Sequence, residues 1–209
     1  MKIQIQQYCN IFSNKVFLNG TLLFEPAHKN TDIDVFLSEI YAFFKMDYRK
    51  FFKMDRLSKV GFVASELMMQ TFDREQPKED MGIIFFNQSS SIEADKAYQQ
   101  TIQDKNNYYP SPAVFVYTLP NIVTGEIAIR NKIHGETAFF VFPLFQSVLI
   151  EETVKSVFSN SGLKNLLVGW VEVAEKELDV CMMLCEVGEE EQIEFNSENI
   201  EKIYNKSLI

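Results

Sequence analysis

The stretch from Pro110 to Gly135 constrains this chain most, because it concentrates residues that interrupt regular structure. Its sequence, PSPAVFVYTLPNIVTGEIAIRNKIHG, carries three of the six prolines and two of the eight glycines. Pro120 suits the first turn of a helix, where its missing N–H would have no intrahelical partner, and Thr118 is an acceptable N-cap. We therefore expect a helix from Pro120 to Asn131.

Most residues of this expected helix are apolar, which predicts that other parts of the protein cover it on most sides. Glu126 and Arg130 lie one turn apart, so they can form an ion pair. Gly125 in the helix interior costs about 1 kcal/mol relative to alanine. Its presence therefore predicts the close approach of another backbone or of a ligand.

Part of this stretch, TLPNIVTGEIAIRNKIHGE, resembles a run of the β-ketoacyl synthases, T-L-x-N-x-x-x-G-x-I-A-I-x-x-x-I-x-G-P, which precedes their nucleophile. Two further segments agree in the same order. Phe52 to Met68 is similar to the family's early R-x-M-x-x-x-x-x-x-x-x-A-A helix, and Asn165 to Glu172 is similar to its strand that ends in G-G-x-E. The matching positions of the first run are Thr118, Leu119, Asn121, Gly125, Ile127, Ala128, Ile129, Ile133 and Gly135.

The resemblance covers roughly residues 50–175 and implies the N-terminal half of a synthase, which is a single half of the thiolase fold. A full synthase of this family has two such halves, so the resemblance implies that the second half is missing. The chain has 209 residues, 46% of them hydrophobic, and can bury one sizeable core. We expect a single β-ketoacyl synthase N-terminal-like domain over residues 1–209, with an acidic tail at roughly 186–209.

The pattern of apolar segments predicts an α/β fold. Strands joined by helices are expected to be parallel, whereas the short link from Ala174 to Glu177 forces the last two strands to be antiparallel. We expect about five strands in a mixed, mostly parallel sheet whose last strand is antiparallel, flanked by helices. The expected strands are 3–8, 16–24 with a turn at Asn19-Gly20, 82–86, 137–142, 166–173 and 178–185, and the expected helices are 35–44, 55–70, 92–103, 120–131, 147–159 and 198–204.

Composition excludes several classes of protein. The longest apolar run, Ala138 to Phe145, has eight residues against the roughly 20 that a membrane span needs, and the N-terminus has no signal-peptide-like stretch. We therefore expect a cytoplasmic protein. The net charge of −9 argues against general nucleic-acid binding. Cys9, Cys181 and Cys185 show no metal-type clustering, so we interpret them as reduced core thiols and expect neither a metal nor a cofactor.

The resemblance implies a nucleophilic cysteine about nine residues after the glycine equivalent to Gly135, at the start of a helix that stabilises a thiolate. That position falls near Leu144, Phe145 or Gln146, and none of them is cysteine. Glutamine occupies it in chain-length-factor subunits, which pair with active ketosynthases. Gln146 is therefore either an equivalent of that glutamine or an ordinary residue at a helix start.

The family's two basic catalytic residues, commonly histidines, come from its second half. His28 and His134 match neither position, and we interpret both as structural or solvated. Ser147 is a possible nucleophile, but the sequence identifies no base for it. We therefore do not expect this chain to condense acyl groups on its own.

Six of the twenty basic residues lie within fifteen positions that contain only two acidic residues, Asp47 and Asp55. One interpretation is a solvated helix surface that balances acidic neighbours. In the resembling family, arginines and lysines of this region help to dock acyl carrier protein, which is small and acidic. The second interpretation is therefore a docking patch for that protein. The residues of this basic strip are Lys45, Arg49, Lys50, Lys53, Arg56 and Lys59.

In the family, the central helix and the strand equivalent to 137–142 help to build the dimer interface and the acyl tunnel. The resemblance thus implies an exposed apolar surface around Phe139, Phe140, Phe142 and Phe145, and such a surface marks an interface. We expect association with a second copy or with a full-length ketosynthase. The candidate substrate and interface residues are Thr118, Asn121, Gly125, Phe140, Phe142 and Phe145.

Three hypotheses about function remain. The first is a non-catalytic, ketosynthase-like accessory subunit of fatty-acid, polyene or polyketide-type biosynthesis. Such a subunit would resemble a chain length factor and bind an acyl carrier protein, an acyl chain or a catalytic ketosynthase. The second is a divergent acyltransferase or condensing enzyme with a rearranged active site, in which Ser147 or a group from a partner acts. The third is a structural interaction protein that kept the fold and lost the ligand.

Overall fold

A computed structural model describes residues 2–28, 31–106, 108–174, 177–188 and 192–207. At its centre is one eight-stranded sheet in the order β3-β2-β1-β7-β6-β4-β5, with the short β8 beside β1. The strands are β1 (Ile3–Phe12), β2 (Lys15–Leu18), β3 (Thr21–Phe24), β4 (Met81–Asn87), β5 (Thr137–Val141), β6 (Asn165–Ala174), β7 (Glu177–Val187) and β8 (Ile193–Glu194).

The sheet is larger and less parallel than the sequence predicted. Among the described strands only β4–β5 and β4–β6 are parallel pairs, and the other pairs are antiparallel. The expectation of about five, mostly parallel strands is therefore wrong. The difference comes from residues 3–24, where tight turns join β1, β2 and β3 into an antiparallel meander. Asn19 and Gly20, with φ of 49° and 78°, form the expected hairpin turn.

Two predictions of strand direction are confirmed. β4, β5 and β6, which helices connect, are parallel neighbours. β6 and β7 are antiparallel along all of β6, although residues 175 and 176 of the link between them lie outside the described residues. β7 also pairs with β1, so the N-terminal meander and the parallel strands form one continuous sheet.

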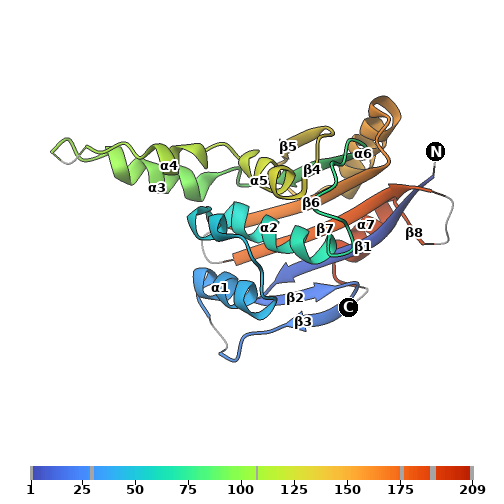
Figure 1. Ribbon diagram of the computed structural model, residues 1–209, viewed down its shortest axis with the longest axis horizontal. Coiled ribbons are helices and arrows are strands. Elements are labelled where there is room, and N and C mark those ends of the chain that lie inside the picture. Colours follow the sequence, from blue (N-terminus) through green and yellow to red (C-terminus); the bar gives the residue numbers. More distant parts are fainter. Residues whose placement is uncertain (1, 29–30, 107, 175–176, 189–191, 208–209) are drawn as a thin grey trace.

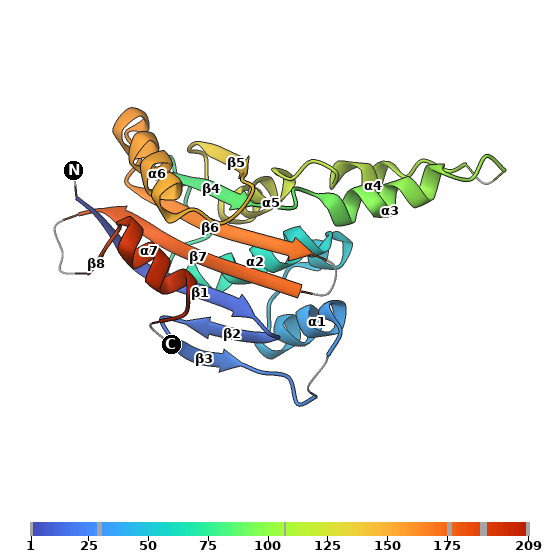
Figure 2. The same ribbon diagram turned by 180° about the vertical axis from the view of Figure 1, so that it is seen from behind.

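Helices cover both faces of this sheet (Figures 1 and 2): α1, α2 and α5 lie on one face, and α6 and α7 lie on the other. None of the helices in the described part of the chain has the length and apolarity that a bilayer crossing requires. The helices are α1 (Ile33–Phe43), the 3₁₀ helix η1 (Arg49–Lys53), α2 (Arg56–Met68), α3 (Ile92–Ile102), α4 (Pro112–Val116), α5 (Ile122–Asn131), α6 (Ser147–Ser161) and α7 (Ser197–Tyr204).

The sheet separates two hydrophobic cores, because successive side chains of a strand point to opposite faces. On β6, Leu167 and Val171 join the core beneath α1, α2 and α5. Leu166, Val168 and Trp170 join the core beneath α6 and α7. β6 is buried on both faces, as a strand in the middle of an α/β sheet should be.

Gly61 allows α2 and α5 to pack closely. A Cβ atom at Gly61 would lie 2.5 Å from Cγ2 of Val123 on α5. Gly125, in contrast, faces open space, with nothing within 4 Å of a Cβ atom placed there. The expected close approach at Gly125 is therefore wrong: the glycine that brings this helix near another lies on α2.

The start of α5 also differs from the prediction. The helix begins at Ile122 rather than at Pro120, and its N-cap is Asn121, whose side chain makes no capping bond. Thr118 instead donates from its hydroxyl to the carbonyl of Phe115, at 2.7 Å. The expectation of a helix covered on most sides is confirmed: of the residues of α5 only Ile129, which is 69% exposed, lies open to solvent.

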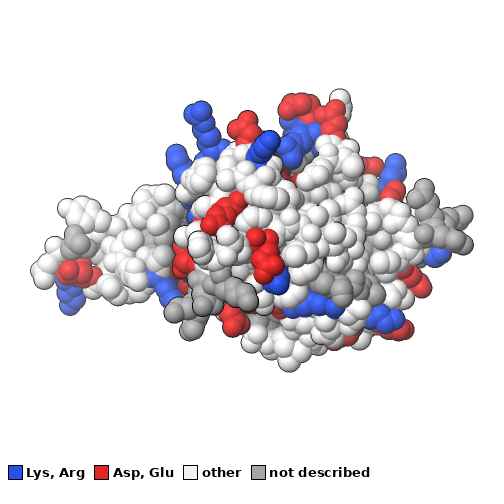
Figure 3. Space-filling view, turned by 90° about the horizontal axis from the view of Figure 1, so that it is seen from below, with Lys and Arg blue, Asp and Glu red and all other residues white. Residues whose placement is uncertain are grey.

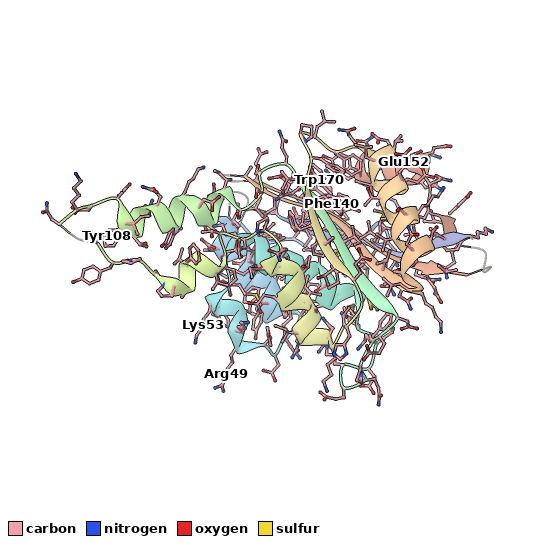
Figure 4. The ribbon with its side chains drawn as sticks, turned by 90° about the horizontal axis from the view of Figure 1, so that it is seen from above. Arg49, Lys53, Tyr108, Phe140, Glu152 and Trp170 are labelled. Carbon is pink, nitrogen blue, oxygen red and sulfur yellow. The ribbon has the colours of Figure 1, made fainter. Side chains whose placement is uncertain are left out.

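We use the name arm for residues 92–116, in which α3 and α4 project from the body of the protein (Figures 1 and 2). α3 is confirmed, whereas α4 was not predicted. α4 begins at Pro112, and Ser111 caps it by accepting a hydrogen bond from N–H of Val114. Tyr108 lies near the tip of the arm, far from the sheet (Figure 4). Seen from below, most of the arm's surface carries no charged residue (Figure 3).

Candidate partner interface and docking surface

β5 forms an open edge of the sheet. Among the described strands it pairs with β4 only, although an apolar run such as 137–142 is typical of a strand that is buried on both faces. Val141 is 50% exposed, and Phe140 is exposed as well, although its ring stacks on that of Phe86 with 5.5 Å between centroids. An unpaired strand with apolar side chains favours pairing with another chain.

The register between β4 and β5 decides which backbone groups remain open at this edge. N–H of Ile83 donates to the carbonyl of Glu136. N–H of Phe142 donates to the carbonyl of Asn87. Because the backbone direction alternates along a strand, the even-numbered residues face β4. The odd-numbered residues Thr137, Phe139 and Val141 therefore direct their N–H and C=O groups away from β4.

Apolar exposure continues from β5 into the first turn of α6. Leu144 is 56% exposed and Val148 is 55% exposed. We call Phe140, Val141, Leu144, Val148 and Leu149, all of them exposed, the edge surface.

Sequence reasoning named only part of the edge surface. Of the four phenylalanines expected to be exposed, only Phe140 is, whereas Phe139, Phe142 and Phe145 are half-buried. Val141, Val148 and Leu149 were missed, because an apolar residue in a short apolar run gives no sign of whether a neighbour covers it.

The position expected for a nucleophile lies where the loop after β5 enters α6. Gln146 is the N-cap of α6, but its side chain makes no capping bond, and Ser147 is the first helical residue. Leu144 points to solvent. Phe145 packs inward, with its ring stacked on Tyr204 at 3.6 Å between centroids and edge-on to Trp170. Of the three predicted positions, Gln146 is therefore the one at the helix N-terminus.

The candidate substrate and interface residues fall on two sides of the sheet. Phe142 and Phe145 pack against the core beneath α6 and α7. Thr118, Asn121 and Gly125 belong to α5 or to the chain before it, on the opposite face. The carbonyl of Thr118 accepts a hydrogen bond from the hydroxyl of Ser91 at 2.6 Å. The structure thus does not gather these residues into one cavity.

Three of the six residues of the basic strip form ion pairs. Lys50 lies 2.8 Å from Oε2 of Glu126, a carboxylate that is otherwise buried. Arg56 holds Asp34 at 2.7 Å, and Lys59 lies 3.9 Å from the same carboxylate. These three cations therefore have structural partners.

Lys45, Arg49 and Lys53 are exposed and have no carboxylate within ion-pair distance among the described residues. Arg49 and Lys53 project to the same side of the molecule (Figure 4). We call these three residues the open basic group. The basic strip is thus neither wholly a balanced surface nor wholly a docking patch, and the open basic group is the part that can receive an acidic partner.

Arg130 does not pair with Glu126, contrary to the sequence prediction. It lies 3.4 Å from Oε1 of the buried Glu66 on α2, which Arg74 also binds at 2.9 Å. Glu126 instead accepts a hydrogen bond from the hydroxyl of Tyr117. Burial, followed by the charge of Glu126, raises the pKa of Tyr117 above its usual range, so this hydroxyl remains a donor.

The three cysteines and His134 lie in surroundings that do not favour a nucleophile and its base. All three cysteines are free and buried, which confirms that they are core thiols. Burial raises the pKa of Cys9 to about 12 and raises the pKa of Cys181 above its usual range. His134 Nδ1 lies 2.7 Å from a carboxylate oxygen of the exposed Glu79. No cluster of potential metal ligands occurs among the residues that the structure describes.

Comparison by sequence finds no matching protein-family model and no matching curated protein. Comparison of the fold with solved structures gives clear matches. The ishigamide ketosynthase/chain length factor superposes with a TM-score of 0.64 at 15% identity, over 92% of this chain and 64% of that chain. The present chain thus spans slightly less than two thirds of that protein's length.

Two further structures agree. The ketosynthase ApeO in complex with its chain length factor ApeC from Xenorhabdus doucetiae matches with a TM-score of 0.59 at 12% identity, over 98% of this chain and 91% of that chain. AntDE:AntF, a type II polyketide synthase acyl-carrier protein in complex with its ketosynthase, matches with a TM-score of 0.57 at 12% identity, over 88% of this chain and 62% of that chain. These likenesses establish the fold: an α/β, thiolase-like half of the kind found in ketosynthases and chain length factors.

Proposed function

We propose that this chain is a non-catalytic, chain-length-factor-like accessory subunit that pairs through β5 with a catalytic ketosynthase in fatty-acid, polyene or polyketide-type biosynthesis. The observation that carries the proposal is the open edge of β5, flanked by the edge surface. The fold is that of chains that occur in ketosynthase–chain length factor complexes. One matched chain of such a complex has nearly the same length as this one.

The residues at the start of α6 support a non-catalytic role. Condensation by a cysteine needs a thiolate, but the positions counted from Gly135 hold Leu144, Phe145 and Gln146. Gln146 lies at the helix N-terminus, where the nucleophile of the resembling enzymes lies. Ser147 follows it, and His134 precedes β5 whereas Ser147 comes after that strand, so the two lie at opposite ends of β5 and His134 is not placed as the base of Ser147. Incubation with an acyl thioester is accordingly expected to leave the mass of the protein unchanged.

The geometry of β5 supports pairing by strand addition. In that mode, main-chain hydrogen bonds supply affinity and side-chain contacts supply specificity. The outward-facing N–H and C=O groups of residues 137, 139 and 141 can make the main-chain hydrogen bonds. The exposed side chains of the edge surface can make the side-chain contacts. A partner strand placed there would extend the sheet beyond β5.

Two substitutions of Val141 test the main-chain hydrogen bonds and the side-chain contacts separately. Val141→Pro removes an outward N–H that makes no bond to β4, so the fold should survive, because proline is tolerated on the solvent side of an edge strand. Val141→Ala keeps the N–H and shortens the side chain. Each tagged variant is used to capture proteins from the cells that make this chain, and the bound proteins are identified by mass spectrometry.

We expect the wild type and Val141→Ala to recover a ketosynthase, and Val141→Pro to recover at least tenfold less of it. Circular dichroism and thermal unfolding confirm that each variant is folded. Failure of the wild type to recover a ketosynthase would contradict the proposal, and so would equal recovery by the proline variant. A homodimer of the wild type, measured by sedimentation and lost in Val141→Pro, would assign the same edge to self-association instead.

The open basic group supports a second part of the proposal, the docking of an acyl carrier protein. Lys45, Arg49 and Lys53 form a cationic surface on a chain whose net charge is −9. An acidic carrier would be attracted to this surface and repelled by most of the rest. Arg56 and Lys59 are less suitable, because Asp34 already engages both.

A further inference from the structure

A pocket of about 310 Å³ lies where the arm meets the body. Residues of α3, α4 and the start of the following turn form one wall, and residues of α1, η1 and α2 form the other. This volume lies at the lower end of the range of small-molecule sites in proteins. The pocket is on the helical side of the sheet that carries α1 and α2, not at the edge of β5.

Small apolar side chains line the interior of the pocket. Ala94, Ala97, Ala113 and Val114 line it from the arm, and Met54 lines it from the body. An alanine leaves space that a larger apolar residue would fill, so the contact region between the arm and the body contains empty space instead of closely packed side chains. Such a lining accepts the apolar part of a ligand.

Acidic groups at the pocket are occupied by other residues of the chain. Asp34 binds Arg56, whose hydrogen bond lowers the pKa of the carboxyl. Asp55 caps α2 by accepting from N–H of Ser58 at 3.0 Å. Asp34 therefore has a counter-charge, whereas Asp55 has a hydrogen-bond donor of the backbone as its partner.

The third carboxylate, that of Glu93, pairs with Lys96 at 3.0 Å. Lys53 differs, because none of the ion pairs among the described residues includes its ammonium group. Asp55 is held by the backbone of α2 rather than by a cation, so Lys53 is the basic side chain at this pocket that has no carboxylate partner among the described residues. A cation beside an apolar hollow favours a ligand that has an anionic head and an apolar tail.

We propose that this pocket binds a small amphipathic anion, with a carboxylate or phosphate head against Lys53 and a short alkyl tail among the alanines. The ligand would bridge the arm and the body. The inference goes beyond the accessory-subunit proposal and does not depend on it, because the pocket is formed by this chain alone.

The test is calorimetric titration of the isolated full chain with three probes that share one octyl tail: nonanoate, octyl phosphate and octylamine. We expect at least one of the anions to bind with a stoichiometry of one and at least tenfold more tightly than octylamine. The better of the two anions shows which head group the site prefers. The three probes differ in the head alone, so tail burial cannot account for the difference.

Variants then locate the binding. Lys53→Met keeps the apolar stem and should weaken anion binding about tenfold, the loss typical of a charge-assisted hydrogen bond. Ala97→Leu places a larger side chain at the pocket wall and should abolish binding of both anions. Lys105→Met, at the far end of the arm, removes an exposed cation outside the pocket and should change nothing.

Binding of octylamine as tightly as nonanoate would overturn the inference. So would unchanged anion affinity in a folded Ala97→Leu variant, or the absence of binding by either anion. The titration needs no partner, so a negative titration would contradict the pocket proposal alone and not the pairing through β5. A negative capture experiment would contradict the pairing alone and not the pocket proposal.

Discussion

Gly61 and Gly125 are two helix glycines in opposite surroundings, and they form a matched pair. Gly125→Ala adds a Cβ in open space and should raise the free energy of unfolding by about 0.5–1 kcal/mol, through helix propensity. Gly61→Ala drives a Cβ to 2.5 Å from Val123. Overpacking costs about 1–3 kcal/mol, so the net effect should be a loss of about 1 kcal/mol. Urea unfolding of both variants measures the difference, and equal stabilisation by both would refute the close packing of α2 on α5.

Lys50 is the residue of the basic strip whose role is most clearly structural. Its amine lies 2.8 Å from Glu126, whose carboxylate is almost fully buried. Lys50→Met should lower the free energy of unfolding by about 1–2 kcal/mol, since the carboxylate loses its counter-charge while the half-exposed lysine itself is partly screened by water. Lys53→Met, on the same 3₁₀ helix, should leave stability unchanged. Thermal unfolding of the two variants at equal salt tests this contrast.

At the scale of elements, the arm depends on few connections to the body. Ser91, at the start of α3, donates to the carbonyl of Thr118 at 2.6 Å and so joins the two ends of the arm. Ser91→Ala removes this buried bond, at a cost of about 1 kcal/mol. We expect the amides of α3 and α4 to exchange hydrogen about fivefold faster, while those of β6 stay unchanged. Ser89→Ala is the control, and faster exchange in both variants would assign the effect to the loop rather than to the bond.

Elements with local stop and start signals were predictable from the sequence. α2, expected over 55–70, starts after the cap Asp55, and α6, expected over 147–159, ends before Gly162 in the left-handed conformation. α4 was missed, because a single turn between prolines has no periodicity to detect. Arg130 was paired wrongly, because Glu66, its partner, is close only after α2 packs on α5.

The exposure of β5 could not be predicted from its own residues. The sequence TAFFV resembles a buried strand of a parallel sheet, and β4, its neighbour, is indeed buried throughout. Whether such a strand lies inside a sheet or at its edge depends on which chain, if any, lies beyond it.

At the scale of the whole molecule, charge is distributed unevenly, and this gives a test of carrier docking. Changing Lys45, Arg49 and Lys53 together to glutamate should weaken binding of a purified acyl carrier protein at least tenfold. The affinity of the wild type should fall as salt is raised, because exposed charges are screened. Fluorescence anisotropy with labelled carrier measures both effects.

A matched variant controls for net charge. Lys2, Lys105 and Lys164 are exposed cations outside the basic strip, and changing all three to glutamate alters the net charge by the same amount. This variant should bind the carrier with only a small loss of affinity. If both triple variants lose affinity equally, long-range repulsion rather than the open basic group accounts for the effect.

The position of β1 in the middle of the sheet has a consequence for synthesis of the protein. β1 pairs along its length with β7, for example Cys9 with Met182, and β7 leaves the ribosome much later than β1 itself. At about 5–20 residues per second, the wait is roughly 10–35 s. During that time an apolar strand is exposed on one side in the cell. Chaperones that hold nascent chains should therefore matter more for this protein than for one whose first strand pairs only with its neighbours in sequence.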